Sequence, residues 1–359
     1  MAGMRDRRFR EGFQRLQQAL RGVPDRVPIT AQMHEFSLAW TGGRGQEFYR
    51  QGQTLVSGIL RTAEAFGFDV PSIGYDVYNI ELEALGQPLI FAEHCAPVAD
   101  SAAVLIASRS ELERLRPPVA GKAGRMPFVL EVHRSFLEQT GVHPTIQFCA
   151  PFSLAALARG YSRFIEDICL EPSFAHELLS FFTEKVIAPW INAQKERFPG
   201  ALFAVGADAL CSPPMTNLQI IREFAIPYIL RLRQLCPLAV SVVNWWGDSC
   251  FGDPEELLKL KLQVSAGLIR AQDPDVARLG ARVFKDFALR HGVALEIGIG
   301  ETVLNQGPVS AIRARIRDCL SQAAEQGRLV LYLTSLSAET PPPHVRAAIQ
   351  AVKDYGLYE

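Results

Sequence analysis

Four ionisable side chains of the sequence stand where short apolar runs give way to loops: His34, Asp76, Asp208 and Glu296. Imidazole and carboxylate groups are the side chains that most often move protons in enzymes. We therefore predict these four residues as catalytic acids or bases. Structural roles compete with this interpretation, because a buried histidine can simply bond a backbone carbonyl and an aspartate often caps the helix that follows it.

A second group of residues at the same run ends could contact a substrate. Their amide and hydroxyl groups would form hydrogen bonds, and their aromatic rings would hold a flat apolar ligand or, through a cation–π contact, a quaternary amine. This predicted binding group consists of Glu35, Gln147, Phe148, Phe152, Asn244, Trp245, Trp246, Gln272 and Ser335. Successive residues of a strand face opposite sides. We therefore expect one of the two adjacent tryptophans to pack against helices and the other to wall the binding site.

The residues alone give no pattern that is typical of a metal site. His34, Cys149, Asp208, Cys211 and Glu296 are suitable ligand types, but they are dispersed along the chain. The sequence has no H-x-C, C-x-x-C or H-x-x-x-H pair, the spacings that bring two ligands to one ion. We accordingly expect no metal ligands among these residues.

The elements that must position these side chains alternate between short β-like runs and longer amphipathic helical patterns. Eight runs are predicted as strands: Pro28–Met33, Phe68–Gly74, Pro144–Cys149, Ala201–Ala207, Ala239–Asn244, Ala266–Ala271, Val293–Gly298 and Leu329–Thr334. Several are almost continuously apolar, as expected of strands that are buried on both faces of a parallel sheet. Helices are predicted at Glu171–Phe198, Thr216–Cys236, Asp273–His291, Pro308–Gln326 and Pro341–Tyr355.

Eight strands separated by helices predict an α/β fold, a single (β/α)8 TIM barrel that forms one domain over residues 1–359. A doubly wound sheet is the alternative, but the P-loop and the G-x-G-x-x-G pattern that bind nucleotides in such sheets are both absent. Between the second and third strands, Arg109–Arg125 is expected to form an irregular excursion over the barrel mouth. Catalytic residues of barrels lie at the carboxyl ends of the strands, and this rule selects the candidates above.

Composition narrows the class of protein further. The 359 residues carry 37 Lys and Arg against 38 Asp and Glu, so electrostatics give no reason to expect nucleic acid as a partner. No apolar run reaches the roughly 18 residues of a membrane span, and the N-terminus lacks the apolar segment of a secretion signal. Seven cysteines without a C-x-x-C pair favour reduced thiols and a cytoplasmic protein. Helix-lined barrels commonly dimerise, so a homodimer is a possible assembly.

Several segments, taken in order, are similar to those of one known family. They are Pro24–Pro28, Gly74–Asp76 with Glu81–Gly86, Ala150–Ala155, Ala207–Asp208 through Pro227–Tyr228, Gly298–Leu304 with Gly307, and Thr340–Ala348 with Tyr355–Gly356. In this order they resemble the uroporphyrinogen decarboxylase superfamily, in particular its branch of cobalamin-dependent methyltransferases, from about Phe13 to Tyr355. The resemblance implies the same barrel fold that the alternation of runs predicts.

Two departures from this family bear on the chemistry. The decarboxylase itself holds the carboxylates of its porphyrinogen with an arginine-containing loop after the first strand, whereas Gln32–Trp40 contains no arginine. Thiol-alkylating members bind zinc through an H-x-C pair after the fifth strand and a cysteine at the eighth. The corresponding positions here are Asn244, Trp246 and Ser335 (or Thr334). Amide, indole and hydroxyl groups do not replace imidazole and thiolate ligands, so we expect no zinc.

The resemblance implies a methyltransferase that moves a methyl group from a small methylated substrate, a methoxy-aromatic compound or a methylamine, to a corrinoid protein. We expect cobalamin to be carried by that separate partner. Without zinc, the proton for the leaving group would come from one of the four predicted catalytic residues. Two alternatives stay open: a metal-independent decarboxylase that acts on a small or porphyrin-like carboxylate, and a non-catalytic barrel that binds a ligand.

Overall fold

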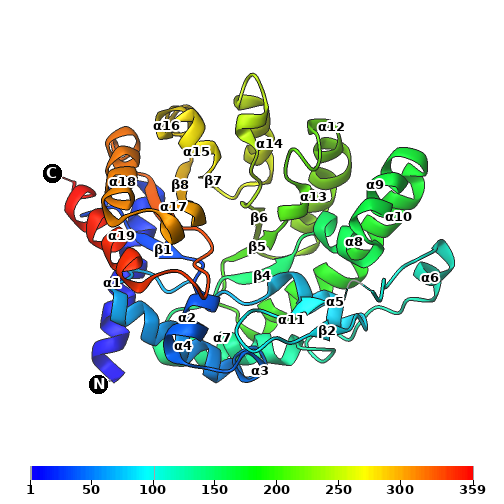
Figure 1. Cartoon of the computed structure of the whole chain (residues 1–359). Coiled ribbons are helices and arrows are strands. Elements are labelled where there is room, and N and C mark those ends of the chain that lie inside the picture. The colour runs from blue at the N-terminus through cyan, green and yellow to red at the C-terminus, as the bar shows by residue number, and fades with distance from the viewer. Residues whose placement is uncertain (1, 101, 359) are drawn as a thin grey trace.

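Parallel strands form two sheets at the centre of the fold (Figure 1). The structure is a computed structural model and describes residues 2–100 and 102–358. One sheet has the strand order β1 (Ile29–Ala31), β9 (Leu329–Leu333), β8 (Ala294–Ile299) and β7 (Leu268–Gln272), and the other has β4 (Ile146–Cys149), β5 (Phe203–Ala207) and β6 (Ala239–Val242). Strands β2 (Leu89–Ile90) and β3 (Val98–Ala99) form a separate antiparallel pair. The predicted α/β class with parallel strands is confirmed.

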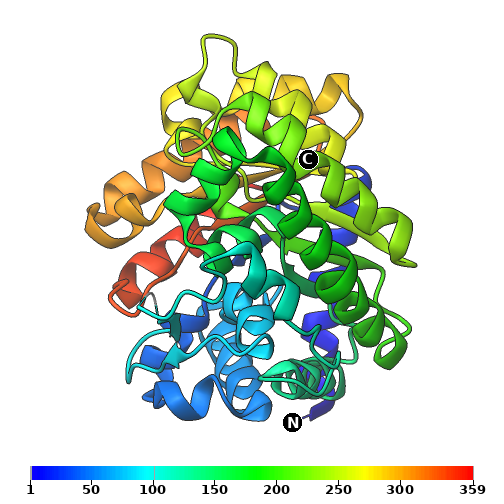
Figure 2. The ribbon, with the colours of Figure 1, turned by 90° about the vertical axis from the view of Figure 1, so that its right-hand side faces the viewer.

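Helices follow the parallel strands and cover their outer side, as Figures 1 and 2 show. Before β4 they are α1 (Ala2–Arg21), α2 (His34–Thr41), α3 (Gly45–Phe48), α4 (Gly52–Phe66), α5 (Ile80–Ala84), α6 (Arg109–Arg114) and α7 (Met126–Thr140). From β4 to β7 they are α8 (Pro151–Arg159), α9 (Tyr161–Leu170), α10 (Pro172–Phe181), α11 (Ala188–Arg197), α12 (Leu218–Ile220), α13 (Ile226–Leu235) and α14 (Glu255–Val264). After β7 come α15 (Asp275–Leu279), α16 (Ala281–Arg290), α17 (Glu301–Gln306), α18 (Val309–Ala323) and α19 (Pro342–Tyr355).

The predicted helices are present, two of them with irregular turns. π-Helical turns at Phe182–Ile187 and Ile221–Ala225 join α10 to α11 and α12 to α13. The expected helix Asp273–His291 is interrupted at Gly280, whose φ of 81° is incompatible with a continuing helix. Among the described residues, no helix combines the length and the hydropathy that crossing a membrane would require.

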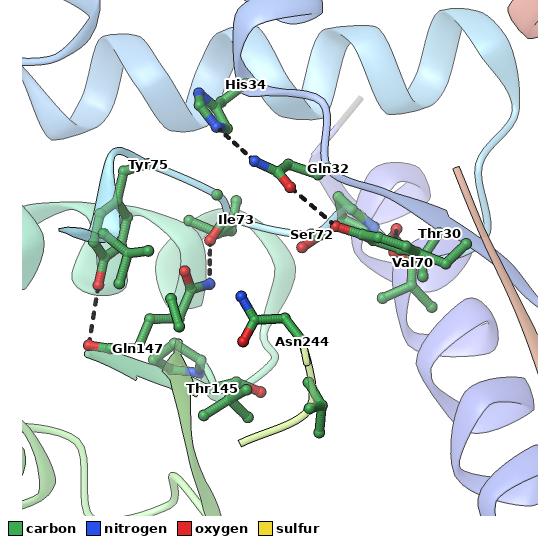
Figure 3. A pocket seen from close by; sticks show the side chains of 18 of the residues that line it. Thr30, Gln32, His34, Val70, Ser72, Ile73, Tyr75, Thr145, Gln147 and Asn244 are labelled. Carbon is green, nitrogen blue, oxygen red and sulfur yellow. Dashed lines mark hydrogen bonds between the residues drawn. The ribbon is translucent and has the colours of Figure 1, made fainter. Parts of the chain in front are cut away.

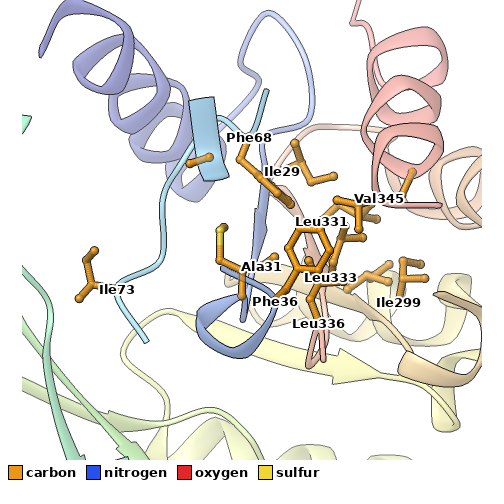
Figure 4. Close-up of a cluster of buried hydrophobic side chains, with 14 of the residues drawn as sticks. Ile29, Ala31, Phe36, Phe68, Ile73, Ile299, Leu331, Leu333, Leu336 and Val345 are labelled. Atoms are coloured by element: carbon orange, nitrogen blue, oxygen red, sulfur yellow. The ribbon is translucent and has the colours of Figure 1, made fainter. Parts of the chain in front are cut away.

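Apolar side chains on the outward faces of both sheets are buried beneath these helices. Figure 4 shows one such cluster, in which Ile29 of β1 and Leu331 and Leu333 of β9 lie with Val345 of α19. All four side chains are fully buried. Burial of an aliphatic side chain of this size contributes about 1.5–3 kcal/mol. This outer packing stabilises strands whose inward faces carry polar groups.

The second predicted strand, Phe68–Gly74, is wrong: among the described residues the segment forms no ladder with any strand. Pro71 in its middle has no N–H to donate to a ladder. One backbone bond, from the Asp69 nitrogen to the Ile29 carbonyl at 3.2 Å, links the segment to β1. Side chains of the neighbouring strands also hold it, since the Thr30 hydroxyl donates to the Val70 carbonyl at 3.1 Å and the Gln147 amide donates to the Ile73 carbonyl at 2.6 Å. The two sheets are therefore joined here without a backbone ladder.

Side chains also span the interval between β6 and β7, which share no ladder in the described part of the chain. The Asp275 carboxylate accepts hydrogen bonds from the backbone nitrogens of Gly247 and Ser249, at 2.7 and 3.0 Å. The buried Lys261 ammonium contacts Asp248 at 2.5 Å and the carbonyl of Arg270 at 3.3 Å. Seven of the eight predicted strands are thus present, and among the described residues backbone hydrogen bonds do not close the ring of eight.

The predicted excursion Arg109–Arg125 is irregular after the short helix α6. Its last residue, Arg125, reaches back to the loop that follows Gly74 and is buried there. The excursion is therefore tied to the segment that carries the predicted residue Asp76.

Candidate functional site

A cavity of about 350 Å³ lies among the two sheets and the extended segment, and it is partly open to solvent. Its lining runs from the loop before β4, at His143–Thr145, to the carboxyl ends of the strands. Figure 3 shows how Gln32, His34, Gln147 and Asn244 surround this space. Of the thirteen predicted site residues, four line it: His34, Gln147, Asn244 and Glu296. The strand-end rule therefore locates the cavity, although it also selects residues outside it.

An arginine and a glutamate face each other across β7 and β8 inside the cavity. Arg270 and Glu296 are direct register partners, and the Nε of Arg270 donates to a carboxylate oxygen of Glu296. The guanidinium lies over the ring of Tyr332, 4.4 Å from its centroid. Burial lowers the pKa of Arg270, but the neighbouring Glu296 more than offsets this effect and the pKa is raised. Arg270 is a permanent cation and the single arginine or lysine among the described lining residues.

A tyrosine hydroxyl at the carboxyl end of the strands accepts two hydrogen bonds. The backbone nitrogen of Ala209 donates to the Tyr78 oxygen at 2.9 Å, and Nδ2 of Asn244 donates to it at 3.0 Å. The orientation of the Asn244 amide follows from its other contact, since its Oδ1 accepts from the backbone nitrogen of Asp208 at 2.8 Å. A phenolic oxygen has two acceptor sites and one proton. Both acceptor sites are used, and among the described residues no acceptor takes the Tyr78 proton. Because this residue lines the cavity, a ligand there can take that proton.

Burial raises the pKa of the Tyr78 hydroxyl above its ordinary value, while the hydrogen bond from Ala209 acts in the opposite direction. The hydroxyl is therefore protonated at neutral pH. If it loses its proton to a ligand, the two N–H donors are already placed to stabilise the resulting oxyanion.

His34, the first residue of α2, is buried, and both of its ring nitrogens are bonded within the protein. Its Nδ1 lies 2.7 Å from the Tyr49 hydroxyl and its Nε2 lies 3.4 Å from the amide nitrogen of Gln32 (Figure 3). Burial lowers the pKa of His34, so the ring is neutral at neutral pH. An amide nitrogen can only donate, so Nε2 accepts from Gln32 and the ring proton is on Nδ1.

Asp76 does not line the cavity. Its carboxylate is buried and forms a bidentate ion pair with Arg125, and it also accepts from Asn79 at 3.2 Å. Arg125 also contacts Glu83 at 2.7 Å. Asp76 therefore pairs with a residue that is 49 positions away in sequence. Only its neighbours in the chain, and not its own side chain, line the cavity.

Asp208 is also buried outside the cavity. Its carboxylate accepts from the backbone nitrogen and hydroxyl of Ser153, at 3.0 and 2.8 Å, and from the indole nitrogen of Trp245 at 2.9 Å. Burial raises the pKa of Asp208 to about 6, against the opposing effect of these donors. The backbone of Asp208 bonds Asn244, so this network fixes the amide that donates to Tyr78.

The remaining predicted binding residues lie away from the lining. Glu35 accepts from the backbone nitrogen of Ala96 at 3.0 Å. Phe148 and Phe152 are fully buried in the core. Trp245 is almost fully buried, and its indole nitrogen donates to Asp208. The others outside the lining are Trp246, Gln272 and Ser335, of which Ser335 lies 3.5 Å from Gln32. Their predicted substrate contacts stay predictions.

Sequence reasoning missed several polar residues of the lining, among them Gln32, Tyr78, Arg270 and Tyr332. A period of two along strands could have found Arg270, because Gln272 was selected and residues i and i−2 share a face. The same step from Thr334 would have reached Tyr332 of β9. Tyr78 lies in a 3-10 turn after the extended segment, where no period applies.

The residues at the family's zinc positions do not fit that metal. Both side-chain atoms of Asn244 are bonded within the protein, and Trp246 and Ser335 bring no imidazole or thiolate. Among the described residues, no group of three or more His, Cys, Asp or Glu side chains is arranged to hold a metal ion.

A family model described as uroporphyrinogen decarboxylase (URO-D) matches residues 12–355. Among solved structures, a methyltransferase from Methanosarcina mazei matches with a TM-score of 0.78 at 18% identity, over 96% of this chain and 99% of that chain. A B12-independent methionine synthase from Shewanella sp. W3-18-1, in complex with selenomethionine, has a TM-score of 0.49 at 11% identity over 86% and 88% of the chains, too weak a likeness to support a shared chemistry. No curated protein sequence matches. Because the family model covers nearly the whole length, this chain belongs to the uroporphyrinogen decarboxylase (URO-D) family.

Proposed function

We propose that this protein transfers the methyl group of a small methylated substrate to a separate corrinoid protein, in the cytoplasm and without zinc. The corrinoid would supply the cobalt that accepts the methyl group, and this chain would bind the donor and stabilise its leaving group. We also infer that the parallel strands and the segment Phe68–Gly74 enclose the cavity as a barrel in one domain. The fold likeness to the Methanosarcina methyltransferase supports this scaffold.

The observation that carries the proposal is the Tyr78 hydroxyl with both acceptor sites used. Loss of a methyl group from a methoxy substrate leaves both electrons of the C–O bond on the oxygen, which then needs a proton. Tyr78 gives its proton to that oxygen, and the tyrosinate is held by the N–H groups of Ala209 and Asn244 until solvent reprotonates it. Burial raises the pKa of Tyr78, so transfer of its proton to an aryl oxide depends on the N–H groups of Ala209 and Asn244 that stabilise the tyrosinate.

The charge of the lining supports a small substrate rather than a porphyrinogen. Of the described lining residues, Arg270 is the single arginine or lysine, and Glu296 is paired with it. A polycarboxylate would find no further guanidinium partners there. The volume of about 350 Å³ lies near the lower end of the range of ligand pockets.

A second candidate function is metal-independent decarboxylation of a small carboxylate. It is favoured by one observation, the presence of the Arg270 guanidinium in the cavity. The proton for the resulting carbanion would again come from Tyr78. This candidate differs from methyl transfer in its products.

The test is to incubate the purified protein with reduced corrinoid protein and with 4-methoxybenzoate, methoxybenzene or tetramethylammonium as donors. The visible absorption of the corrinoid reports its methylation, and released carbon dioxide is measured in parallel. We expect an absorption change that depends on both the protein and the donor. No change with any donor, together with carbon dioxide release, would replace methyl transfer by the second candidate.

A further inference from the structure

The guanidinium of Arg270 has donors in the cavity that no protein group uses. An arginine has five N–H donors. Nε bonds Glu296, while neither Nη atom has a hydrogen-bond partner among the described residues. The side chain is 18% exposed, and its exposed part belongs to the cavity lining. These donors are open to the cavity, so this position favours a ligand that brings acceptor atoms.

The surroundings of Arg270 fix which edge of the guanidinium is available. Glu296, its register partner on β8, takes the Nε side. The ring of Tyr332 covers one face of the guanidinium plane, 4.4 Å from the Cζ atom. The hydroxyl of Tyr332 lies 3.4 Å from Gln32 Oε1, which anchors this ring. The edge formed by the two Nη atoms is therefore held in place and free, and this edge matches the two oxygens of a carboxylate.

We infer that Arg270 forms an anion subsite that binds one carboxylate, and that the methyl donor is therefore a methylated monocarboxylic acid. The identification of this acid as the methyl donor rests on the proposed function. The anion subsite itself does not depend on it. Tyr78 and Arg270 both line the cavity, so one small molecule can place its carboxylate on Arg270 and its methylated oxygen near Tyr78. A single guanidinium selects one carboxylate and leaves additional ones unpaired.

Glu296 has a distinctive part in this arrangement, because it is a carboxylate that competes with the ligand for the same cation. Its side chain is 7% exposed. Removing its charge takes a repulsive neighbour away from the bound anion, while the amide oxygen of glutamine can still accept from Nε. A purely structural role of the pair predicts weaker binding on loss of either partner, whereas the anion subsite predicts tighter binding of carboxylates in Glu296→Gln.

The experiment measures binding by titration calorimetry at pH 7 without corrinoid. Three matched pairs serve as probes: acetate with acetamide, benzoate with benzamide, and 4-methoxybenzoate with 4-methoxybenzamide. We expect the wild type to bind the acid at least tenfold more tightly than the amide in one or more pairs. The double variant Arg270→Gln with Glu296→Gln, which leaves no unpaired charge, should lose that preference while keeping its affinity for the amide. Glu296→Gln alone should bind the acid at least threefold more tightly.

Arg282→Gln is the matched control, because Arg282 forms an exposed ion pair with Glu325 outside the cavity. Circular dichroism checks that each variant is folded, and if the double variant is unfolded the Glu296→Gln measurement decides. Equal binding of acid and amide in all three pairs overturns the subsite, as does weaker acid binding in Glu296→Gln. Acid preference without any methylation of corrinoid would leave the subsite standing and refute the proposed function alone.

Discussion

Replacing Tyr78 with phenylalanine removes the one proton that the proposed methyl transfer takes from this chain. The ring stays in place, so binding of the substrate should change little. A positioned general acid contributes about 10²–10⁴ in rate, which corresponds to about 2.7–5.4 kcal/mol of transition-state stabilisation. We therefore expect kcat to fall at least a hundredfold, with KM nearly unchanged, when corrinoid methylation is followed by its visible absorption.

The structural cost of this change is separable from its catalytic effect. The N–H groups of Ala209 and Asn244 lose their common acceptor, but the cavity is partly open and water can replace the hydroxyl. Urea unfolding should therefore show a loss below about 2 kcal/mol. Tyr161→Phe is the matched control, because the Tyr161 hydroxyl donates to the Met215 carbonyl at 2.7 Å outside the cavity. This control should leave the rate unchanged.

Two further readings distinguish a proton donor from a structural tyrosine. With methyl ethers of increasingly acidic phenols, the leaving oxygen needs less help from a proton, so the loss in Tyr78→Phe should shrink. Asn244→Asp keeps the size of the side chain but adds an acceptor that would take the Tyr78 proton, so it should lower the rate although Tyr78 is intact. A variant Tyr78→Phe that keeps a third of the wild-type kcat, or a loss equal for all ethers, would refute the reasoning.

The other predictions concern the buried carboxylates and the metal. Asp76→Asn leaves Arg125 without its bidentate partner, so urea unfolding should show a loss of about 3–5 kcal/mol, and wild-type stability would contradict that role. Burial raises the pKa of Glu81 to about 8, against the hydrogen bond from Cys149. The folded state then keeps a proton that the unfolded chain releases near pH 4.5, so stability falls as pH rises from about 4.5 to 8, by up to about 1.4 kcal/mol per unit. Glu81→Gln should flatten that slope, and an unchanged slope would show that other groups cause the pH dependence of stability. Elemental analysis should find well under one zinc per chain, and one tightly bound zinc would refute the reading of Asn244, Trp246 and Ser335.

The sequence predicted the parallel strands well because their signal is local. Runs such as Val293–Gly298 are apolar and bounded by turn residues, and β8 occupies nearly the same positions. Phe68–Gly74 carries a similar composition, yet apart from one backbone bond to Ile29 its neighbours bond it through the side chains of Thr30 and Gln147. The residue types within a segment do not show which groups of distant strands will bond to it. A strand at Phe68–Gly74 could therefore not be excluded from the segment's own sequence.

The sequence also could not separate carboxylates that face the cavity from those that face a partner elsewhere. Asp76 pairs with Arg125 and Asp208 with Trp245, at separations of 49 and 37 positions. Glu296 stands at a similar strand-end position but faces Arg270 within the cavity. The difference is set by which long-range partner the fold supplies, and no local pattern encodes it.

Asn244 connects the missing zinc ligand to the proposed acid. An imidazole at this position would have an acceptor nitrogen for a metal, whereas the amide of Asn244 uses its oxygen on the Asp208 backbone and its nitrogen on Tyr78. A metal stabilises negative charge on a leaving group as a Lewis acid, and a hydroxyl held by two N–H donors stabilises it by giving up a proton. The same position can therefore serve either chemistry, according to whether its side chain offers an acceptor to an ion or a donor to a phenol. In this chain the donor faces Tyr78, and so the proposed function assigns leaving-group stabilisation to that hydroxyl.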